Sequence, residues 1–521
     1  MEKLLKYLYC KYNEIITEEL DFNNLNNCIL NENTVLKILK EGAKDKYDIE
    51  NKIKIYDKKF VRKIMKEYLE TSQSVELVFE SNFEQSNSIF LIFDYLSLIV
   101  CDMPESFFCE KLKIEKIRFL QIVLSIVLYV LFQETYAMVG DKITKTQKKW
   151  LLGRDDFYFG VEDIKKVCWE IEQKDFDNFC NLYAIDLDNM YIELNNKNVQ
   201  EGFYKYRDNY FILKIQKFLK YVLIKTEIMF KDFSDIRSFS EYQNKKGKTF
   251  ENIVYDFVRG IYKTNVFHSL KYYPKSDKDC EIDIIIKQNK DLLIIECKSG
   301  VIDLHSEETD IAIKKKIFTK VKKAYKTLDD VHKYLQSNNC YCFSNKCNKL
   351  CGNNIEEVIC LHLTMYPLDF ISSNIHTLDV EEYLHKNGNP KITMSFEHFI
   401  AICLDCVEKN DDIFNYLKRR KEIIKENPKL RLDWNELDLY YQLSKKSSLL
   451  SNFLLNDNIE MNMITATFRE EFGNEYSPAK KMVDKIDQIR LHKIFKTGKS
   501  IYSLNRRFLI NLEEFMNLNG L

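Results

Sequence analysis

Three ionisable side chains stand in and beside two strongly apolar runs of the sequence. Asp283 lies within the run 281–287, Glu-Ile-Asp-Ile-Ile-Ile-Lys, while Glu296 and Lys298 lie at the end of the run 292–298. Each run is expected to form a buried strand, where an ionised group is costly unless it is paired or binds a metal. Two carboxylates and a lysine that meet at strand ends could bind a divalent cation and hydrolyse a phosphodiester bond.

The spacing of these residues predicts that they face one another. Side chains alternate along a strand, so Glu296 and Lys298 point to one face and Cys297 points to the other. The polar residues 288–290 separate the two runs and predict a hairpin turn, which places Asp283 on the neighbouring strand. Two carboxylates this close repel each other unless a cation lies between them, and Mg²⁺ or Mn²⁺ suits oxygen ligands.

These residues, together with Glu251 on the helix before them, make up the predicted site. Asp283, Glu296 and Glu251 are the candidate side-chain metal ligands, and the backbone carbonyl of Cys297 could supply another oxygen. Lys298 would orient a metal-bound water or neutralise the charge that develops on the phosphate. The predicted catalytic residues are therefore Asp283, Glu296, Lys298 and Glu251, and no covalent protein nucleophile is required.

The surrounding pattern predicts a compact α/β unit around these residues. Apolar positions recur with helical spacing on both sides of the two runs, and shorter apolar runs predict further strands. In chain order, the predicted elements are a helix at 247–258, strands at 264–273, 283–287 and 292–298, a helix at 311–335 and a strand at 358–363. The carboxylates thus lie between a preceding helix and a following lysine-rich helix.

The same residues resemble the motif of a known family. Its pieces, in chain order, are Gly247-x-x-Phe-Glu251, Glu281-x-Asp283 and Glu296-Cys-Lys298. In this order and spacing, they resemble the PD-(D/E)xK superfamily, the restriction-endonuclease-like nucleases, over about residues 245–365. Ile282 stands where the family usually has a proline, a departure that is common within the superfamily.

The resemblance implies a restriction-endonuclease-like core and a Mg²⁺-dependent endonuclease that hydrolyses DNA, or less commonly RNA, with a metal-activated water. Such multidomain nucleases often serve prokaryotic defence against foreign DNA. The partners implied are nucleic acid and either a second copy of the chain or another protein of a defence system. Two alternatives stay open: a catalytically silent subunit that binds nucleic acid or assembles with other proteins, and a toxin that is silent until a partner triggers it.

At 521 residues, the chain is too long for one ordinary core and is expected to be a multidomain α+β protein. Its 6 prolines and 13 glycines are few for this length, which favours long helices. The predicted domains are a mainly helical N-terminal domain at 1–237, the nuclease-like domain at 238–370 and a helical C-terminal domain at 371–521. The end of the chain, about 460–521, has the helix–helix–hairpin outline of a winged helix.

The net charge of −1 excludes a basic surface over the whole chain, so any nucleic-acid contact must be local. In the family that the motif resembles, the helix after the lysine motif often approaches the phosphate backbone. The candidate contacts are Lys320 and Lys323 on the helix 311–335 and Lys480, Lys481 and Lys485 in the winged-helix-like end. The simpler interpretation of each lysine-rich stretch is a solvated helix face.

Fifteen cysteines without a framework spacing, and no secretory-signal pattern at the start, predict free thiols in a cytoplasmic protein. Cys340, Cys342, Cys347 and Cys351 could hold a structural Zn²⁺. Their spacing lacks paired C-x2-C units, which favours ordinary free cysteines in a loop. The apolar run 119–132 is shorter than the about 20 residues of a bilayer span; it predicts a buried core helix and no membrane association.

Overall fold

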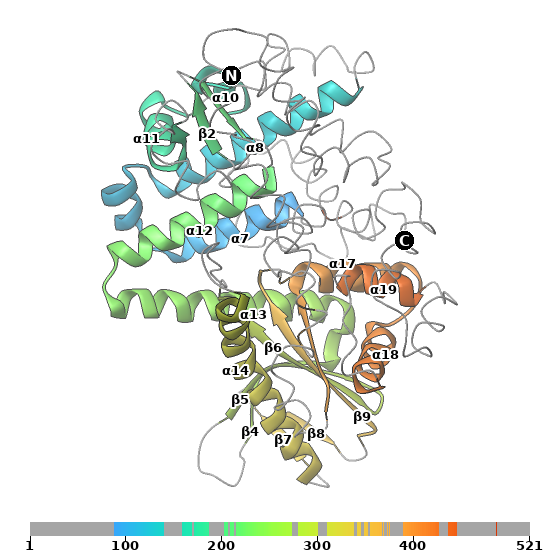
Figure 1. The fold of residues 1–521 in the computed structure, drawn as a ribbon. Helices are drawn as coiled ribbons and strands as arrows, with labels where there is room; N and C mark the ends of the chain where they lie inside the picture. The colour runs from blue at the N-terminus through green and yellow to red at the C-terminus, as the bar shows by residue number, and fades with distance from the viewer. Residues whose placement is uncertain are drawn as a thin grey trace. The chain divides into compact units, whose positions relative to one another are not determined.

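The structure of the protein is a computed structural model (Figure 1). The described residues are 88–139, 159–168, 171–186, 203–206, 209–212, 215–272, 280–300, 310–337, 341–344, 349–352, 355–366, 389–426 and 436–444, with the single residues 368, 372, 375 and 486. The predicted winged-helix-like end at about 460–521 lies outside them, apart from Ile486.

The chain divides into two compact units. Of the described residues, the first unit holds 103–233, and the second holds 88–102 and 234–444 with Ile486. The helix that begins at Ile89 therefore precedes the described residues of the first unit in the sequence but belongs to the second.

The first unit combines helices with a small sheet (Figure 1). Its helices are α8 (Lys116–Val139), α10 (Val161–Val167), α11 (Gln173–Tyr183) and α12 (Ile215–Phe233), with a π-helical turn at Phe107–Leu112. Its strands are β1 (Ile185–Asp186), β2 (Phe203–Tyr206) and β3 (Asn209–Ile212). They form a three-stranded sheet in the order β1-β2-β3, so this part of the predicted helical region contains strands as well.

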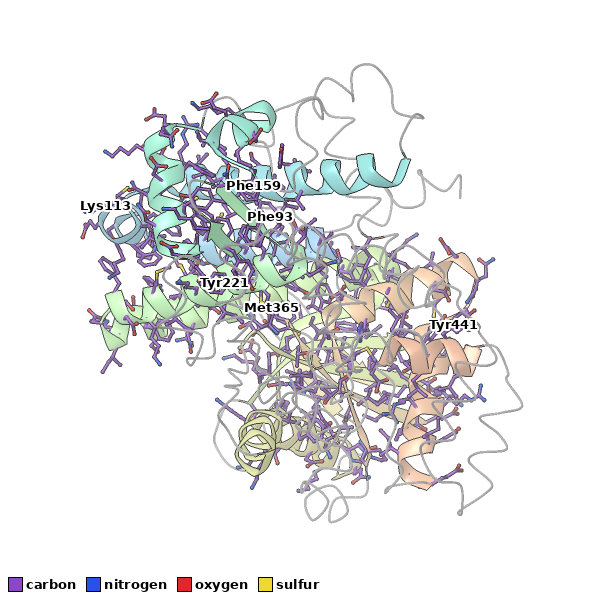
Figure 2. The ribbon with its side chains drawn as sticks, turned by 45° about the horizontal axis from the view of Figure 1, so that its top comes forward. Phe93, Lys113, Phe159, Tyr221, Met365 and Tyr441 are labelled. Atoms are coloured by element: carbon purple, nitrogen blue, oxygen red, sulfur yellow. The ribbon has the colours of Figure 1, made fainter. Side chains whose placement is uncertain are left out.

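Aromatic side chains form the core of the first unit. Phe119 of α8 packs on Phe179 of α11 with ring centroids 5.7 Å apart. Phe159, which is labelled in Figure 2, stacks on Phe203 of β2 with ring centroids 6.2 Å apart. Large buried rings supply most of the apolar burial of a small core. The run 119–132 lies within α8, and all but one of its described side chains are buried, which confirms the predicted core helix. No helix in the part of the chain that the structure describes is long and apolar enough to cross a bilayer.

The second unit is built on a seven-stranded mixed sheet. Its strands are β4 (Val266–Tyr272), β5 (Cys280–Gln288), β6 (Asp291–Lys298), β7 (Tyr341–Ser344), β8 (Lys349–Gly352), β9 (Glu357–Thr364) and β10 (Lys391–Ser395). Their order is β10-β9-β6-β5-β4-β7-β8. Strands β6, β9 and β10 run parallel, whereas β4, β5 and β6 form an antiparallel meander.

Helices pack on both this sheet and one another. They are α7 (Ile89–Asp102), α13 (Ile236–Tyr262), α14 (Asp310–Ser337), α17 (Phe396–Glu408), α18 (Ile413–Glu426) and α19 (Glu436–Ser444). Helix α13 lies against β4, β5 and β6, α14 lies against β6 and β9, and α18 lies against β9 and β10. The side chain of Asp235 caps α13 by accepting a 2.6 Å hydrogen bond from the N–H of Ser238.

The elements predicted around the candidate site are confirmed. The helix, the three strands, the lysine-rich helix and the later strand correspond to α13, β4, β5, β6, α14 and β9. The predicted hairpin turn joins β5 to β6, and Asn289 within it has a left-handed φ of 53°. Asparagine tolerates this conformation better than most residues, which is why a short polar pair can reverse the chain here.

The chain after residue 370 is not purely helical, and the prediction of a helical C-terminal domain is wrong for β10. Lys391–Ser395 adds a strand to the edge of the sheet, in parallel register with β9. The segment Lys-Ile-Thr-Met-Ser does alternate polar and apolar residues, as a strand does, but at five residues it is a short signal beside the helical pattern that follows it. Its lysine is buried all the same, because the partner that neutralises it comes from another element.

That partner is Asp329 of α14. The Nζ of Lys391 lies 2.5 Å from Asp329 Oδ1, with both side chains almost fully buried, and it also donates to the carbonyl of Asn389 at 3.1 Å. A buried ion pair contributes little net stability, but the loss of one partner leaves an uncompensated charge in the core. The pair therefore fixes how α14 and β10 dock in the second unit.

Replacing Asp329 by alanine should lower the free energy of unfolding by about 3–5 kcal/mol, because Lys391 is left buried and charged. Urea denaturation followed by circular dichroism measures the change. The double variant Asp329→Leu/Lys391→Met, which removes both charges, should recover most of the loss. An Asp329→Ala protein as stable as wild type would contradict the buried pair.

Candidate active site

The sheet of the second unit forks at the predicted site. The β5–β6 ladder ends at the pair Ile284 and Ile295, although both strands continue. Beyond that pair, β5 stays paired with β4 as far as Cys280, and β6 stays paired with β9 as far as Lys298. The two middle strands of the sheet thus separate, and each is held by its outer neighbour.

Asp283 and Glu296 are the first residues past the last β5–β6 pair, one on each side of the fork. Continuing the register by one position places them opposite each other, and opposite residues of an antiparallel pair share a face of the sheet. The Oδ2 atom of Asp283 accepts a 2.7 Å hydrogen bond from the backbone N–H of Cys297. This bond spans the fork where the backbone ladder no longer does.

Lys298 lies on the same side as Glu296, as the alternation predicts. Its Nζ forms an ion pair with Glu296 Oε1 and donates a hydrogen bond to the carbonyl of Cys297 at 3.2 Å. Glu296 is buried, whereas about a third of Lys298 is exposed. The Cys297 carbonyl, predicted as a metal ligand, therefore accepts a hydrogen bond from Lys298 in this structure.

Helix α13 brings the fourth predicted residue, Glu251, to the carboxylates. The charge of Glu251 acts on both Asp283 and Glu296. The helix passes close to the end of β6 here, since a Cβ added to Gly247 would make an ordinary van der Waals contact, at 3.8 Å, with Ser299 Oγ directly after Lys298. The structure thus gathers the sequence-predicted set from α13, β5 and β6.

Burial and mutual repulsion set the protonation of these groups. Burial, followed by the charges of Glu296 and Glu251, raises the pKa of Asp283 well above its usual value. Burial also raises the pKa of Glu296, even though the Lys298 ammonium works in the opposite direction. Burial opposes the charge of Lys298, yet the Glu296 and Asp283 carboxylates raise its pKa. The site therefore favours the protonated form of Lys298 and disfavours the ionised forms of Asp283 and Glu296.

The donor set fits a hard divalent cation in its chemistry. Asp283 and Glu296 offer carboxylate oxygens from opposite sides of the fork, and a cation between them would relieve the repulsion that helps to raise the pKa of Asp283. The second oxygen of each carboxylate makes no hydrogen bond to any residue that the structure describes. Among the described residues, no three His, Cys, Asp or Glu side chains are already gathered at one point as a metal cluster. Binding would thus require small side-chain shifts.

Two residues beside the site were not singled out by the sequence. Lys248 donates 2.6 Å hydrogen bonds to Glu251 Oε2 and to Ser269 Oγ of β4. Its spacing of three residues from Glu251 on a helix is the signal that could have revealed the pair. Ser269 carries no such signal, because its role depends on a backbone φ of 53° within a strand.

A buried histidine also adjoins the site. His362 of β9 is the register partner of Glu296, and its Nδ1 lies 3.2 Å from the hydroxyl of Thr393, which also bonds Tyr325 at 2.8 Å. Burial, assisted by the charge of Lys298, lowers the pKa of His362 to about 3. The ring is therefore neutral, and the chain of hydroxyls holds it in place beside Glu296.

The predicted nucleic-acid contacts can be placed only in part. Lys323 of α14 is exposed, and its charge acts to lower the pKa of Glu296, so it lies near the site. The side chain of Lys320 and all of Lys480, Lys481 and Lys485 lie outside the described residues.

The predicted zinc cluster is likewise only partly described. The backbones of Cys342 and Cys351 are directly opposite each other in the β7–β8 hairpin. Cys340 and Cys347 lie outside the described residues. The hairpin register is compatible with free cysteines as well as with a metal, so the zinc hypothesis stays a prediction.

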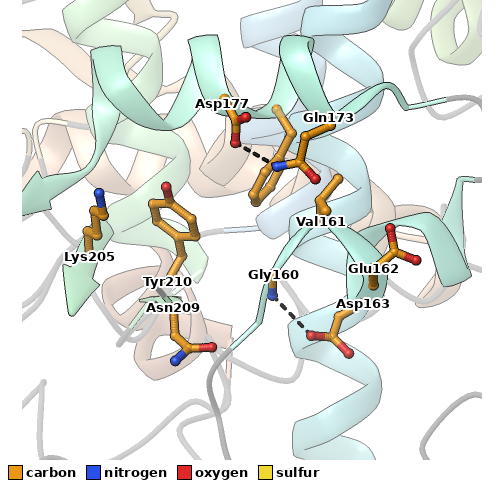
Figure 3. Close-up of a pocket in the computed structure, with 10 residues that line it drawn as sticks. Gly160, Val161, Glu162, Asp163, Gln173, Asp177, Lys205, Asn209 and Tyr210 are labelled. Atoms are coloured by element: carbon orange, nitrogen blue, oxygen red, sulfur yellow. Dashed lines mark hydrogen bonds between the residues drawn. The ribbon is translucent and has the colours of Figure 1, made fainter. Parts of the chain in front are cut away.

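The first unit has a pocket of its own, of about 390 Å³ (Figure 3). Lys205 and Tyr210 line it from the strands, and Gln173 and Asp177 line it from α11, where Gln173 donates to Asp177 at 2.8 Å. None of the predicted catalytic residues contributes to this pocket, because all four belong to the second unit.

Comparison with known proteins gives one partial match. A family model described as a domain of unknown function, DUF4143, matches residues 246–343. That stretch contains the second part of α13 and all of β4, β5, β6 and α14, and therefore every predicted catalytic residue. The comparisons with curated proteins and with solved structures find no match.

Replacing Asp283 by asparagine should stabilise the metal-free protein at neutral and alkaline pH. A carboxyl group with a higher pKa in the fold than in the unfolded chain favours folding in acid, and this contribution is lost as pH rises through the folded pKa. Asparagine cannot ionise but can still accept from the Cys297 N–H. In EDTA at pH 8, the melting temperature should rise by about 2–4 °C, and the gain should shrink as the pH falls toward about 4.

Thermal melts across this pH range test the prediction. Asp330→Asn is the matched control, because Asp330 is an exposed aspartate on α14 of the same unit; its effect should be small. If Asp283→Asn does not raise the melting temperature, or raises it equally at every pH, the ionised carboxylate of Asp283 does not destabilise the fold as predicted.

Proposed function

We propose that this protein is a Mg²⁺-dependent endonuclease of the PD-(D/E)xK class that hydrolyses phosphodiester bonds in DNA. The observation that carries the proposal is the fork between β5 and β6, where Asp283 and Glu296 face each other with Lys298 beside them. The motif resemblance supplies the substrate class, with RNA as the less favoured substrate. The biological setting that it suggests is prokaryotic defence against foreign DNA.

Each residue of the site has a distinct task in the proposed reaction. A divalent metal bound here would lower the pKa of a water and stabilise charge on the scissile phosphate. Asp283 and Glu296 are the residues that would hold the metal, and Glu251 would add a carboxylate from the helix side. Lys298, which is protonated and partly exposed, would bring a fixed positive charge to the phosphate oxygens.

The surroundings support a substrate with phosphate groups. Lys323 on α14 is exposed and close enough to Glu296 for its charge to act on the pKa of that carboxyl group. A lysine at this position would contact the phosphate backbone beside the scissile bond and make binding depend on salt. The site as a whole is acidic, so such local lysines are needed to admit a polyanion.

Purified protein with Mg²⁺ or Mn²⁺ should cleave plasmid or single-stranded DNA and leave 5′-phosphate ends. Glu296→Ala and Lys298→Ala should each lower the rate by about 10²–10³-fold, because each removes a charge that acts on the reacting phosphate. The control is Lys290→Ala, which changes an exposed lysine at the far end of the same hairpin and should leave the rate unchanged.

Gel assays on supercoiled, linear and single-stranded DNA and on RNA decide the outcome. If wild type and both variants are equally inert on every substrate, this result contradicts the enzyme proposal. That result would favour the silent nucleic-acid-binding or assembly subunit or the toxin that a partner triggers, and a metal bound between Asp283 and Glu296 would distinguish the toxin from the silent subunit.

A further inference from the structure

Lys248 connects three elements at the edge of the site. From α13, its Nζ donates to Glu251 Oε2 and to Ser269 Oγ at 2.6 Å each, and it lies 3.6 Å from Glu281 Oε1. About half of its side chain is exposed. It thus joins α13, β4 and β5 on the open side of the fork.

The position of Ser269 shows that this contact is built into the strand. Ser269 lies between the β4–β5 pairs of His268 with Ile284 and Leu270 with Ile282, opposite Asp283. Its φ of 53° is left-handed, a conformation that non-glycine residues avoid and that rarely occurs inside a strand. The distorted backbone presents the serine hydroxyl to Lys248, and the surrounding ladder holds it there.

The charges around the fork fall into two groups. Glu296 is neutralised by Lys298. Lys248 pairs with Glu251 and, at a longer distance, with Glu281. Lys248 therefore supplies, from within the chain, positive charge to a carboxylate that the proposed metal would also use. Two cations that bind the same carboxylate repel each other, and each weakens the binding of the other.

We propose that Lys248 is a positioning residue that holds Glu251 in the metal-free site and competes with the divalent cation for it. The inference rests on the proposed metal-dependent function and deepens it, because it names the residue that sets the metal requirement. The half-exposed lysine can swing on its flexible stem when the metal takes Glu251. The protein thus keeps Glu251 paired until the metal arrives.

Calorimetric titration of the full chain with Mn²⁺ alone tests this proposal without any activity assay. Lys248→Met should bind Mn²⁺ at least about five-fold more tightly than wild type, because a competing charge is gone. Lys248→Arg, which keeps the charge, should restore wild-type affinity. Lys245→Met is the matched control, since Lys245 is a half-exposed lysine on the same helix that pairs with Asp102 at 3.1 Å. Thermal melts of all variants check that each one folds.

A second measurement tests whether the effect acts through Glu251. In a Glu251→Gln background, the gain from Lys248→Met should fall by at least about half, as expected for residues that share one interaction. Lys248→Met that binds Mn²⁺ no more tightly than Lys245→Met, or more weakly than wild type, would overturn the inference while leaving the proposed function intact. Absence of Mn²⁺ binding in every variant would overturn both.

Discussion

The second unit depends on one constraint: Asp283 and Glu296 are placed opposite each other at the point where two buried strands separate. Burial raises the pKa of both carboxyl groups, and the charge of Glu251 adds to the effect on each, so their ionisation is opposed by the fold itself. The protein meets this cost with the Cys297 N–H on one side and the Lys298 ammonium on the other. A site that tolerates two carboxylates only with such support is well suited to take up a cation.

The rest of the unit holds the two sides of the fork in place. Strand β5 pairs with β4, and strand β6 pairs with β9, so each strand keeps a backbone ladder beyond the point where β5 and β6 separate. Behind β9, the buried pair of Lys391 and Asp329 and the hydrogen bonds of His362 fix β10 and α14. Rigid support of this kind keeps catalytic groups within the narrow geometry that phosphoryl chemistry requires.

The local part of this arrangement could be predicted from the sequence. Alternation along two apolar runs, separated by a short polar turn, determines that Glu296 and Lys298 share a face with Asp283. The non-local part could not be predicted. Lys391 looks like a surface residue until Asp329 from another element neutralises it, and Ser269 looks like an ordinary strand residue until its φ of 53° is known. Both depend on contacts between segments that no periodicity connects.

The most direct test of the central claim is a crystal structure of the protein with Mn²⁺, in which anomalous scattering locates the metal. The account predicts an anomalous peak at the fork, with oxygens of Asp283 and Glu296 at ligand distance and Lys298 still beside them. A peak elsewhere in the chain would contradict it. A structure at saturating Mn²⁺ with no metal between Asp283 and Glu296, and with Asp283 still bonded only to the Cys297 N–H, would also contradict it.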